Sequence, residues 1–264
     1  MTRRASYGID APGVVFGLLC GGLGMLVVAV VNAFLDVSPW GVAACLVVSA
    51  YFFASAALFL HTTLRGKFQV WSRVLEDLAL RGDEQVLDLG CGRGAVLIAV
   101  ARRLPRGRVT GVDLWRSVDQ SGNSEAVTRA NAEAEGVSDR IELRTADVTE
   151  LPFPDGSFDL VVSSLVIHNI HAKQGRRKAV AEAVRVLRPG GRLVIADISH
   201  ARDYAAQLST TTADSAGGAD GSGRSAGNLG SQVEAVTCRP LGWRFWFSPW
   251  ITTTLVTARK PAPA

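Results

Sequence analysis

The sequence has few cysteines and no concentrated run of basic residues, and each absence excludes a class of function. The cysteines stand at positions 20, 45, 91 and 238, where no two have the spacing of metal ligands and none requires a disulfide partner. We therefore expect no metal site, and a reducing compartment. The net charge of +4 comes without a basic stripe or interleaved aromatic residues on a soluble segment, so we expect no nucleic-acid binding. This small basic excess suits an anionic membrane surface instead.

Charged residues are absent from two long stretches near the N-terminus. Residues 11–35 and 37–60 contain no Asp, Glu, Lys, Arg or His, and Asp36 alone separates them. Each stretch exceeds the ~20 apolar residues that a helix needs to cross the hydrocarbon of a bilayer. We predict a transmembrane helical hairpin within residues 1–62, with spans at about 11–35 and 38–60.

Two other interpretations of these stretches are open. The first stretch, with the small residues VNA at 31–33, could be a signal peptide, although a second apolar stretch argues against cleavage. Both stretches could instead be core helices of a globular protein, although such helices usually carry polar residues on one face. Small residues at four-residue spacing favour two helices packed closely in a membrane, and the first pair also permits dimerisation. These residues are Gly17 and Gly21 in the first stretch and Ala50 and Ala54 in the second.

Basic residues lie at the two outer ends of the hairpin. Arg3 and Arg4 precede the first span, Arg65, Lys67 and Arg73 follow the second, and the connecting turn has no base. Because positive flanks stay on the cytosolic side of a membrane, we predict that both termini and the whole second domain are cytosolic. The sequence thus predicts a multi-pass protein of the cell membrane with two spans.

Strand-like and helix-like segments alternate after the hairpin. This alternation predicts an α/β fold in residues 63–264, with a parallel sheet between two layers of helices. The run at about 209–231 consists mainly of Ser, Thr, Gly, Ala and Asp, and we predict a disordered low-complexity loop there. The expected helices are 68–80, 95–104, 124–136, 176–188 and 201–208, and the expected strands are 85–90, 108–115, 140–147, 158–166, 192–197, 232–241 and 251–260.

The first predicted strand of this domain ends in a glycine-rich turn, VLDLGCGRG at 86–94. A Cβ at Gly90, Gly92 or Gly94 would obstruct a sharp turn in which the backbone approaches a ligand. The helix that follows presents its N-terminus, which favours a carboxylate or a phosphate. A purely structural turn explains the glycines equally well. The G-x-G-x-G spacing differs, however, from the G-x-G-x-x-G of dinucleotide-binding folds.

Carboxylates end the next two predicted strands. Asp113 stands 19 residues after Gly94, where an acid can accept the hydroxyl protons of a ribose, and a helix N-cap is the alternative. Asp147 repeats the arrangement after the third strand, where it can accept from an exocyclic adenine amine with the backbone of Val148 beside the ring. The two acids together favour a ligand that contains a nucleoside.

Four segments taken together resemble one enzyme family. VLDLGCGRG, GVDLW, ADVTELPFPDGSFDLVVSS and VLRPGGRLVIAD have the order and spacing of the motifs of class I S-adenosylmethionine-dependent methyltransferases. The group that contains ubiquinone/menaquinone C-methyltransferases is the most similar, and the resemblance covers about residues 68–260. It implies a doubly wound, Rossmann-like, mostly parallel seven-stranded sheet, and S-adenosyl-L-methionine as the cofactor. It does not identify the substrate.

The resemblance also implies that residues at the ends of the first four strands bind the cofactor. The glycine turn would hold its methionine end, and the acid after the second strand would hold its ribose. The segment after the third strand would take its adenine edge, and a serine after the fourth strand would line it. The residues are Asp88, Gly90, Cys91, Gly92 and Gly94 in the turn, then Asp113 and Leu114, Asp147 and Val148, and Ser163 and Ser164.

Two segments depart from the usual pattern of the family. The segment after Asp113, WRSVDQSGNSEAV, is longer and more polar than usual, so Asp119, Gln120 and Asn123 could shape the pocket or form a solvated loop. The low-complexity run at 209–231 falls where the family often places a substrate lid, and an insertion without function is the alternative.

Two further clusters have open roles. His168 and His171 follow the fourth strand, where ligands of this fold bind, and either could be a general base, with His168 favoured. Only a carbon acid or a poorly ionised hydroxyl needs a base, and otherwise His168 packs against the cofactor or caps a helix. An aromatic cluster could touch the bilayer interface, line an apolar acceptor pocket or form ordinary core. Its members are Trp243, Phe245, Trp246, Phe247 and Trp250.

The sequence therefore predicts a membrane-anchored S-adenosylmethionine-dependent methyltransferase that acts on a small acceptor, and the hairpin suggests a lipophilic one. A non-catalytic membrane scaffold that retains the fold is the alternative from a different class, and the intact glycine turn and Asp113 argue against it. A nicotinamide-dependent oxidoreductase is disfavoured by the glycine spacing.

Overall fold

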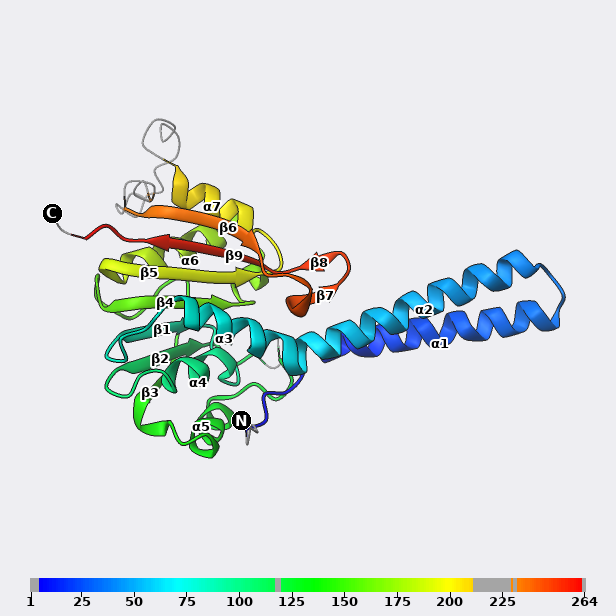
Figure 1. Cartoon of the computed structure of the whole chain (residues 1–264), viewed down its shortest axis with the longest axis horizontal. Helices are drawn as coiled ribbons and strands as arrows, with labels where there is room; N and C mark the ends of the chain where they lie inside the picture. The colour runs from blue at the N-terminus through cyan, green and yellow to red at the C-terminus, as the bar shows by residue number, and fades with distance from the viewer. Residues whose placement is uncertain (1–4, 117–119, 211–228, 230–231, 263–264) are drawn as a thin grey trace.

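The computed structural model describes residues 5–116, 120–210, 229 and 232–262 of the chain. A long helical hairpin projects from one end of an α/β domain (Figure 1). Arg3, Arg4, Asp119 and nearly all of the predicted loop at 209–231 lie outside the described residues.

The hairpin consists of α1 (Pro12–Phe34) and α2 (Pro39–His61), whose bounds lie about one residue from those of the predicted spans. Each begins with a proline, which fits the first turn of a helix because its missing N–H has no partner there in any case. Both helices are long and apolar enough to cross a membrane. Only 17% and 22% of their most apolar segments are buried within this chain.

The two helices pack along a seam that repeats every seven residues. Its buried positions include Val15, Gly22 and Ala29 on α1, and Ser49 and Ala56 on α2. The Ser49 Oγ donates a hydrogen bond to the Gly22 carbonyl at 2.8 Å. A seven-residue repeat is the signature of coiled-coil packing, in which side chains of one helix fit between those of its partner.

This seam corrects the predicted contact between small residues. Gly17 has open space where a Cβ would stand, and Ala50 and Ala54 are exposed. Of the four predicted residues only Gly21 contacts the opposite helix, at Phe52. The prediction counted uniform four-residue steps, whereas a coiled-coil seam alternates steps of three and four residues.

The hairpin joins the domain at both of its ends. α2 continues through the π-helical turn η1 (Thr62–Gly66) into α3 (Lys67–Asp77). On the other side, a segment that precedes α1, the N-terminal strap (residues 5–10), lies along the domain. The two ends meet in an ion pair of 2.7 Å between Asp10 and Lys67, whose side chains are 16% and 7% exposed.

Seven of the described strands form one sheet in the order β3-β2-β1-β4-β5-β9-β6. All neighbouring pairs are parallel except the two that involve β9. The strands are β1 (Gln85–Leu89), β2 (Arg108–Asp113), β3 (Ile141–Thr145), β4 (Phe158–Ser164), β5 (Leu187–Asp197), β6 (Glu234–Pro240) and β9 (Thr254–Arg259).

Helices cover both faces of the sheet, as Figure 1 shows. Successive residues of β1 belong to different cores: Val86 joins residues of α3 and α4 (Ala95–Ala101), and Leu87 joins residues of α6 (Lys173–Arg185) and α7 (Ala201–Ser209). α5 (Glu125–Ala134) contributes Ala132 to the first core. Strands buried on both faces are typical of doubly wound α/β folds, so the predicted fold class is confirmed.

Three predicted helix ends, those of α3, α4 and α6, lie three residues too far along the chain. α6 ends at Arg185 rather than at the residue before Pro189, and β5 already begins at Leu187. Pro189 and the glycine after it lie in an irregular part of the strand, where the register against β4 shifts. A proline that stops a helix is also tolerated in a strand at a bulge, and this explains the difference.

The aromatic segment forms separate elements between the last two predicted strands. It forms η6 (Trp243–Phe245) and a small hairpin of β7 (Trp246–Ser248) and β8 (Ile251–Thr252). Thr253 is fully buried and its hydroxyl donates to the Phe245 carbonyl at 2.6 Å, which separates β8 from β9. The predicted strand at 251–260 is therefore two strands in two sheets.

The carboxyl ends of the parallel strands point toward the hairpin (Figure 1). In an open α/β sheet, ligands bind outside these ends, at the point where the strand order reverses. Here that point lies between β1 and β4, because the chain builds outward to β2 and β3 on one side and to β5 on the other. The expected ligand site therefore lies at the end of the domain from which the hairpin projects.

Candidate functional site

The glycine turn (residues 90–94) joins β1 to α4 at the carboxyl edge of the sheet. Gly90, Gly92 and Gly94 have φ angles of 67°, 50° and 86°, in the left-handed region that favours glycine. A Cβ on Gly90 would overlap the side chain of Val166, and one on Gly92 would lie 2.7 Å from the Gln120 Oε1. Two neighbouring loops thus approach the turn so closely that it tolerates no side chain at either position.

Asp88 is the most buried acid of this region, with 1% of its surface exposed. Its Oδ2 has no hydrogen-bond partner within the described part of the chain. Burial, together with the nearby charge of Asp113, raises the pKa of Asp88 well above its usual range, and the Leu97 N–H only partly offsets this. A buried oxygen without a partner is costly, so the position fits a ligand that donates hydrogen bonds or carries positive charge.

Asp113 ends β2 and ties the glycine turn to the loop that follows β2. Its carboxylate accepts hydrogen bonds from Gly92 N at 2.8 Å, Trp115 N at 2.6 Å and the Asn123 amide at 3.2 Å. The next helix, α5, is capped by Ser124, so Asp113 is not a helix cap. A carboxylate accepts about four hydrogen bonds, which leaves capacity for a ribose hydroxyl.

The loop after β2 folds back over the glycine turn. The Gln120 Oε1 accepts from Arg93 N at 2.9 Å, and Asn123 is 8% exposed beside Asp113. Gln120 and Asn123 therefore shape the site and do not belong to a solvated loop. The third residue predicted for this loop, Asp119, lies outside the described residues.

The N-terminal strap closes the same side of the site, and sequence reasoning missed it. The Gln120 amide donates to the Tyr7 carbonyl at 3.3 Å and to Asp10 Oδ1 at 2.9 Å. Arg93 donates to the Ser6 carbonyl at 2.7 Å. The one signal in the sequence was Asp10, a lone carboxylate directly before a long apolar stretch.

The ends of β2 and β3 form the part of the edge predicted to hold adenine. Leu114 is 43% exposed there, and the Trp115 indole donates to the Thr145 hydroxyl at 2.8 Å, which links the two strand ends. Asp147 is exposed after β3 and Val148 is buried beside it. The sequence indicated Leu114, Asp147 and Val148 but not Trp115.

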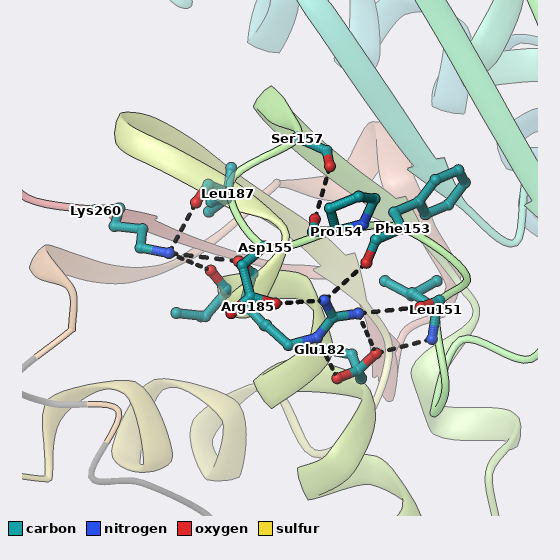
Figure 2. Close-up of polar contacts among 10 residues, drawn as sticks. Leu151, Phe153, Pro154, Asp155, Ser157, Glu182, Arg185, Leu187 and Lys260 are labelled. Carbon is teal, nitrogen blue, oxygen red and sulfur yellow. Dashed lines mark hydrogen bonds and ion pairs between the residues drawn. The ribbon is translucent and has the colours of Figure 1, made fainter.

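The loop between β3 and β4 is fixed by a charged cluster around Arg185, which Figure 2 shows. Arg185 donates to the carbonyls of Leu151 and Phe153 at 3.0 and 2.8 Å. It also pairs with Asp155 and Glu182, at 2.7 Å each. Five donors of one guanidinium in a fixed fork suit such a cluster, and they hold the loop that follows the predicted adenine-binding residues.

Glu182 is the acid at the centre of this cluster. Burial alone raises the pKa of Glu182, but hydrogen bonds from Arg185 and from the Leu151 N–H outweigh burial, so that its pKa is lowered. Glu182 is therefore ionised at neutral pH and contributes to holding the loop.

Two predicted residues do not present their side chains to the site. Cys91 is 6% exposed and packs against Gly111 of β2, and its N–H donates to the Val112 carbonyl at 3.1 Å. Ser163 is fully buried and donates to the Leu89 carbonyl at 3.4 Å. Both lie near the motif in sequence, but the turn and the strand direct their side chains inward.

Ser164, the other predicted serine, lies at the carboxyl end of β4. Its hydroxyl accepts a hydrogen bond from the Trp71 indole at 2.9 Å. Trp71 is 3% exposed and belongs to α3, which continues the second helix of the hairpin. This partly buried hydrogen bond connects α3, which continues the hairpin, to the end of β4.

His168 follows β4 and stands beside a buried acid that the sequence did not indicate. Its Nδ1 lies 2.5 Å from Asp197 Oδ1, at an ion-pair distance but without the angle of a hydrogen bond. The His168 N–H donates to Asp197 Oδ2 at 3.1 Å, and the Tyr204 hydroxyl lies 3.3 Å from the same oxygen. Burial and the charge of Asp197 raise the pKa of Tyr204, so its hydroxyl stays protonated as a donor.

His171 has a different position. It is exposed, and its carbonyl accepts a hydrogen bond from Arg176 at 2.8 Å. The structure thus separates the two candidate bases, because it gives His168 an orienting carboxylate and leaves His171 at the surface. Leu165, with a left-handed φ of 61°, marks the turn that brings His168 back to Asp197.

Comparison with known proteins agrees with the motifs. Residues 87–195 match the family model described as a methyltransferase domain. The chain is 34% identical over 143 residues to a ubiquinone/menaquinone biosynthesis C-methyltransferase, UbiE, from Roseobacter denitrificans, which covers 54% of each chain. It is 38% identical over 124 residues to a 27-O-demethylrifamycin SV methyltransferase from Amycolatopsis mediterranei, or 46% of this chain and 40% of that one. The chain thus spans about half the length of the curated relatives it matches.

Solved structures share the fold of the domain. The [4+2]-cyclase SpnF superposes with a TM-score of 0.53 at 20% identity, over 74% of this chain and 82% of that one. A geranyl diphosphate methyltransferase, in complex with GPP and sinefungin, gives 0.52 at 17% identity, over 78% and 82%. At these identities the likeness shows the fold alone, and the cyclase is a reminder that one fold serves several reactions.

The ordered motifs, the doubly wound sheet and the matched relatives agree for the part of the chain from β1 to β5. S-adenosyl-L-methionine is the cofactor of enzymes with this domain. Residues 87–195 form a methyltransferase domain of the class I S-adenosylmethionine-dependent family.

Proposed function

We propose that this protein is a membrane-anchored methyltransferase that transfers a methyl group from S-adenosylmethionine to a small, lipophilic acceptor. The observation that carries the proposal is the glycine turn with Asp88 and Asp113 at the edge of the sheet that faces the hairpin. When bound, the cofactor supplies a sulfonium methyl group as the electrophile. The protein's part is to bind, orient and exclude water.

The residues present fit this cofactor. Asp88 offers a buried oxygen without a partner to an ammonium group, and the turn at Gly90 and Gly92 leaves backbone in place of side chains. We assign the ribose to Asp113 and the adenine edge to Leu114 and the segment that begins at Asp147. Binding through Cys91 and Ser163 is not proposed, because their side chains are buried elsewhere.

We assign the general base to His168 for acceptors that must lose a proton. The Asp197 carboxylate lies 2.5 Å from His168 Nδ1 and the Tyr204 hydroxyl donates to Asp197, so a buried acid stands behind the imidazole. An orienting acid behind a histidine is a recurrent arrangement in proton-transfer sites. The step is needed only where the acceptor atom still carries its proton, as a phenol or an acidic C–H does.

The lipophilic acceptor is inferred from the hairpin and supported by the names of the relatives. Ubiquinone, menaquinone and rifamycin are ring systems with extended apolar parts, and two curated relatives are named for them. An acceptor of this kind dissolves in the bilayer, and two helices able to span it would hold the enzyme where the acceptor is concentrated. The positive flanks at 65–73 favour a catalytic domain on the cytosolic side.

The test is methyl transfer by the purified full-length protein. It is incubated with methyl-labelled S-adenosylmethionine and, separately, with membrane and cytosol extracts, and the label entering the organic phase is counted. Asp113→Ala is the blank, and Asp139→Ala, which removes an exposed acid at the opposite edge of the sheet, is the matched control. We expect organic-phase label with the wild type and Asp139→Ala but not with Asp113→Ala.

Label confined to water-soluble products would overturn the lipophilic acceptor and leave methyl transfer intact. Calorimetry with S-adenosylhomocysteine separates the remaining outcomes. Binding without any transfer would favour the non-catalytic scaffold, whereas binding of NADH in its place would revive the oxidoreductase.

A further inference from the structure

The β7–β8 hairpin lies against the hairpin root, by which we mean residues 59–64, where the long helical hairpin joins the domain. Phe247 of β7 meets Phe59 of α2 edge to face, with ring centroids 4.9 Å apart. The Thr62 hydroxyl donates to the Trp246 carbonyl. Trp243 of η6 stacks on His61, the last residue of α2, with centroids 5.4 Å apart. These contacts hold the aromatic segment beside the end of α2. The segment therefore lies at the same depth, relative to a membrane, as that end of the helix.

If α2 spans the bilayer, that depth is the headgroup region. A helix of 23 residues is about 34 Å long, slightly more than the ~30 Å of hydrocarbon in a bilayer. The end of α2 at His61 therefore reaches the interface between hydrocarbon and water. Trp243 and the β7–β8 hairpin, which pack on this end, are placed at the same level.

Exposed apolar side chains of the domain gather at this place. Among the described residues outside the hairpin (residues 12–61), five large apolar side chains are exposed, and Leu114 at the predicted cofactor site is the only one remote from the hairpin root. The other four are Leu64 at 50%, Trp243 at 52%, Trp250 at 81% and Ile251 at 41%. Apolar side chains grouped on a soluble surface mark a contact with a partner or a membrane.

Charge around this group suits lipid headgroups. Arg65 is exposed one residue after Leu64, and the Arg244 guanidinium lies over the Trp243 ring at 4.8 Å. Tryptophan and arginine together are enriched at membrane interfaces, where the ring sits at headgroup level and the cation meets lipid phosphate. The group is also continuous with helices that are apolar enough to span the membrane.

We propose that Trp243, Trp250 and Ile251, together with Leu64, insert into the headgroup layer of the membrane as a second anchor. The occupant of this surface is the lipid bilayer, and the inference rests on the proposed membrane anchoring by the hairpin. The two helices alone allow the domain to tilt, whereas a second contact on one side holds it in one orientation. The carboxyl edge of the sheet, with the glycine turn and His168, then opens toward the membrane surface.

The test uses a fluorescent label at position 250 of the full-length chain in nanodiscs of phosphatidylcholine and phosphatidylglycerol. Cys20, Cys45 and Cys238 are replaced by alanine, and Cys91 is kept because burial raises the pKa of its thiol and makes it unreactive. A single cysteine then carries the polarity-sensitive probe NBD in three proteins, Trp250→Cys, Trp40→Cys and Asp139→Cys. Trp40 lies in the turn region of the hairpin, at the opposite membrane surface, and Asp139 precedes β3 at the edge farthest from the hairpin.

We expect the emission at position 250 to shift to the blue as far as that at position 40, and to be quenched by headgroup-nitroxide lipids. Emission at position 139 is expected to remain that of a probe in water. Water-like emission at position 250 would overturn the second anchor, provided that position 40 remains in the interface and the protein resists carbonate extraction. Release by carbonate, with all three probes in water, would instead show that the hairpin does not anchor the protein, so the two failures are distinguishable.

Discussion

The candidate site has two halves, one at the carboxyl end of β1 and one at the carboxyl end of β4, and they are built from different chemical groups. After β1, the glycine turn is main chain held by main chain and by Asp113, with positive φ angles at Gly90, Gly92 and Gly94. After β4, the edge consists of titratable side chains, His168, Asp197 and Tyr204, for which we propose a role in proton transfer. A main-chain cradle binds by shape, whereas titratable side chains act on the rate. Substitutions in the first half should therefore change cofactor affinity, and those in the second half should change turnover.

The largest effect is expected at Gly90. Gly90→Ala would put a methyl group into the side chain of Val166 and would also place alanine at a φ of 67°, so we expect S-adenosylhomocysteine to bind about 100-fold more weakly or worse. Gly136→Ala is the matched control, because Gly136 has a φ of 68° but open space around its Cβ position. It should lower the free energy of unfolding by about 1–2 kcal/mol and leave the affinity unchanged. Calorimetry and thermal melting measure both.

The next largest effect is expected in the half of the site after β4. His168→Gln should lower kcat about 100-fold or more for an acceptor that must lose a proton, because a positioned base contributes about that much. The dissociation constant of S-adenosylhomocysteine should stay the same. His171→Gln, at the surface, should leave kcat unchanged. A loss of cofactor affinity in His168→Gln would mean that His168 only packs against the cofactor.

Asp197→Asn should lower kcat by at least about tenfold, since it removes the charge that orients His168 without changing the size of the side chain. The KM for the acceptor and the cofactor affinity should change little. The control is Asp203→Asn, which breaks an exposed pair with His200 at 3.3 Å. Equal kcat in both variants would refute the role of Asp197 in orienting the base.

The smallest effect tests the support behind the adenine segment. Glu182→Gln removes the charge that pairs with Arg185, and because Glu182 is partly exposed we expect a loss of only about 1 kcal/mol, or about 2–4 °C in Tm. The pKa of Glu182 is lowered from its ordinary 4.5, so its contribution is present above that pH and is lost as the pH falls through the folded-state value. The difference in Tm from the wild type should thus shrink in acid. Glu125→Gln, in an exposed helical pair with Arg129, should at every pH change Tm by less than Glu182→Gln does at neutral pH.

The sequence predicted the sheet and the positions of the glycine turn and Asp113 at the strand ends, because both depend on local patterns, and the binding of the cofactor there stays a prediction. The apolar runs of the strands and the glycine spacing at 90–94 are readable within a few residues. The acid at Asp113 follows from its place at the end of a strand. The seam of the membrane hairpin was misjudged because it depends on how two helices are phased against each other, which a single spacing of small residues does not determine.

The half of the candidate site after β4 could not be completed from the sequence. Asp197 looks like an ordinary residue at the end of a strand, and Tyr204 like one apolar position of a helix. Only the parallel pairing of β4 and β5, with Ser164 opposite Ala196, brings Asp197 next to His168. The strap was missed for the same reason, since its partners lie 53 to 130 residues further along the chain.

The long sequence separation between the strap and its partners has a consequence for how the chain is synthesised and folds. Of the strap's partners, a ribosome makes Thr63 and Lys67 directly after the hairpin, and Arg93, Gln120 and Glu135 much later. If the hairpin spans the membrane as proposed, it can enter the bilayer before most of the strap is paired, and the strap then closes over the glycine turn late in folding. Arrested nascent chains that end before α5 should accordingly be cut by protease within residues 5–10, and full-length chains should be protected there. Cofactor binding would then report that the folding of the chain, and on our proposal its insertion into the membrane, is finished.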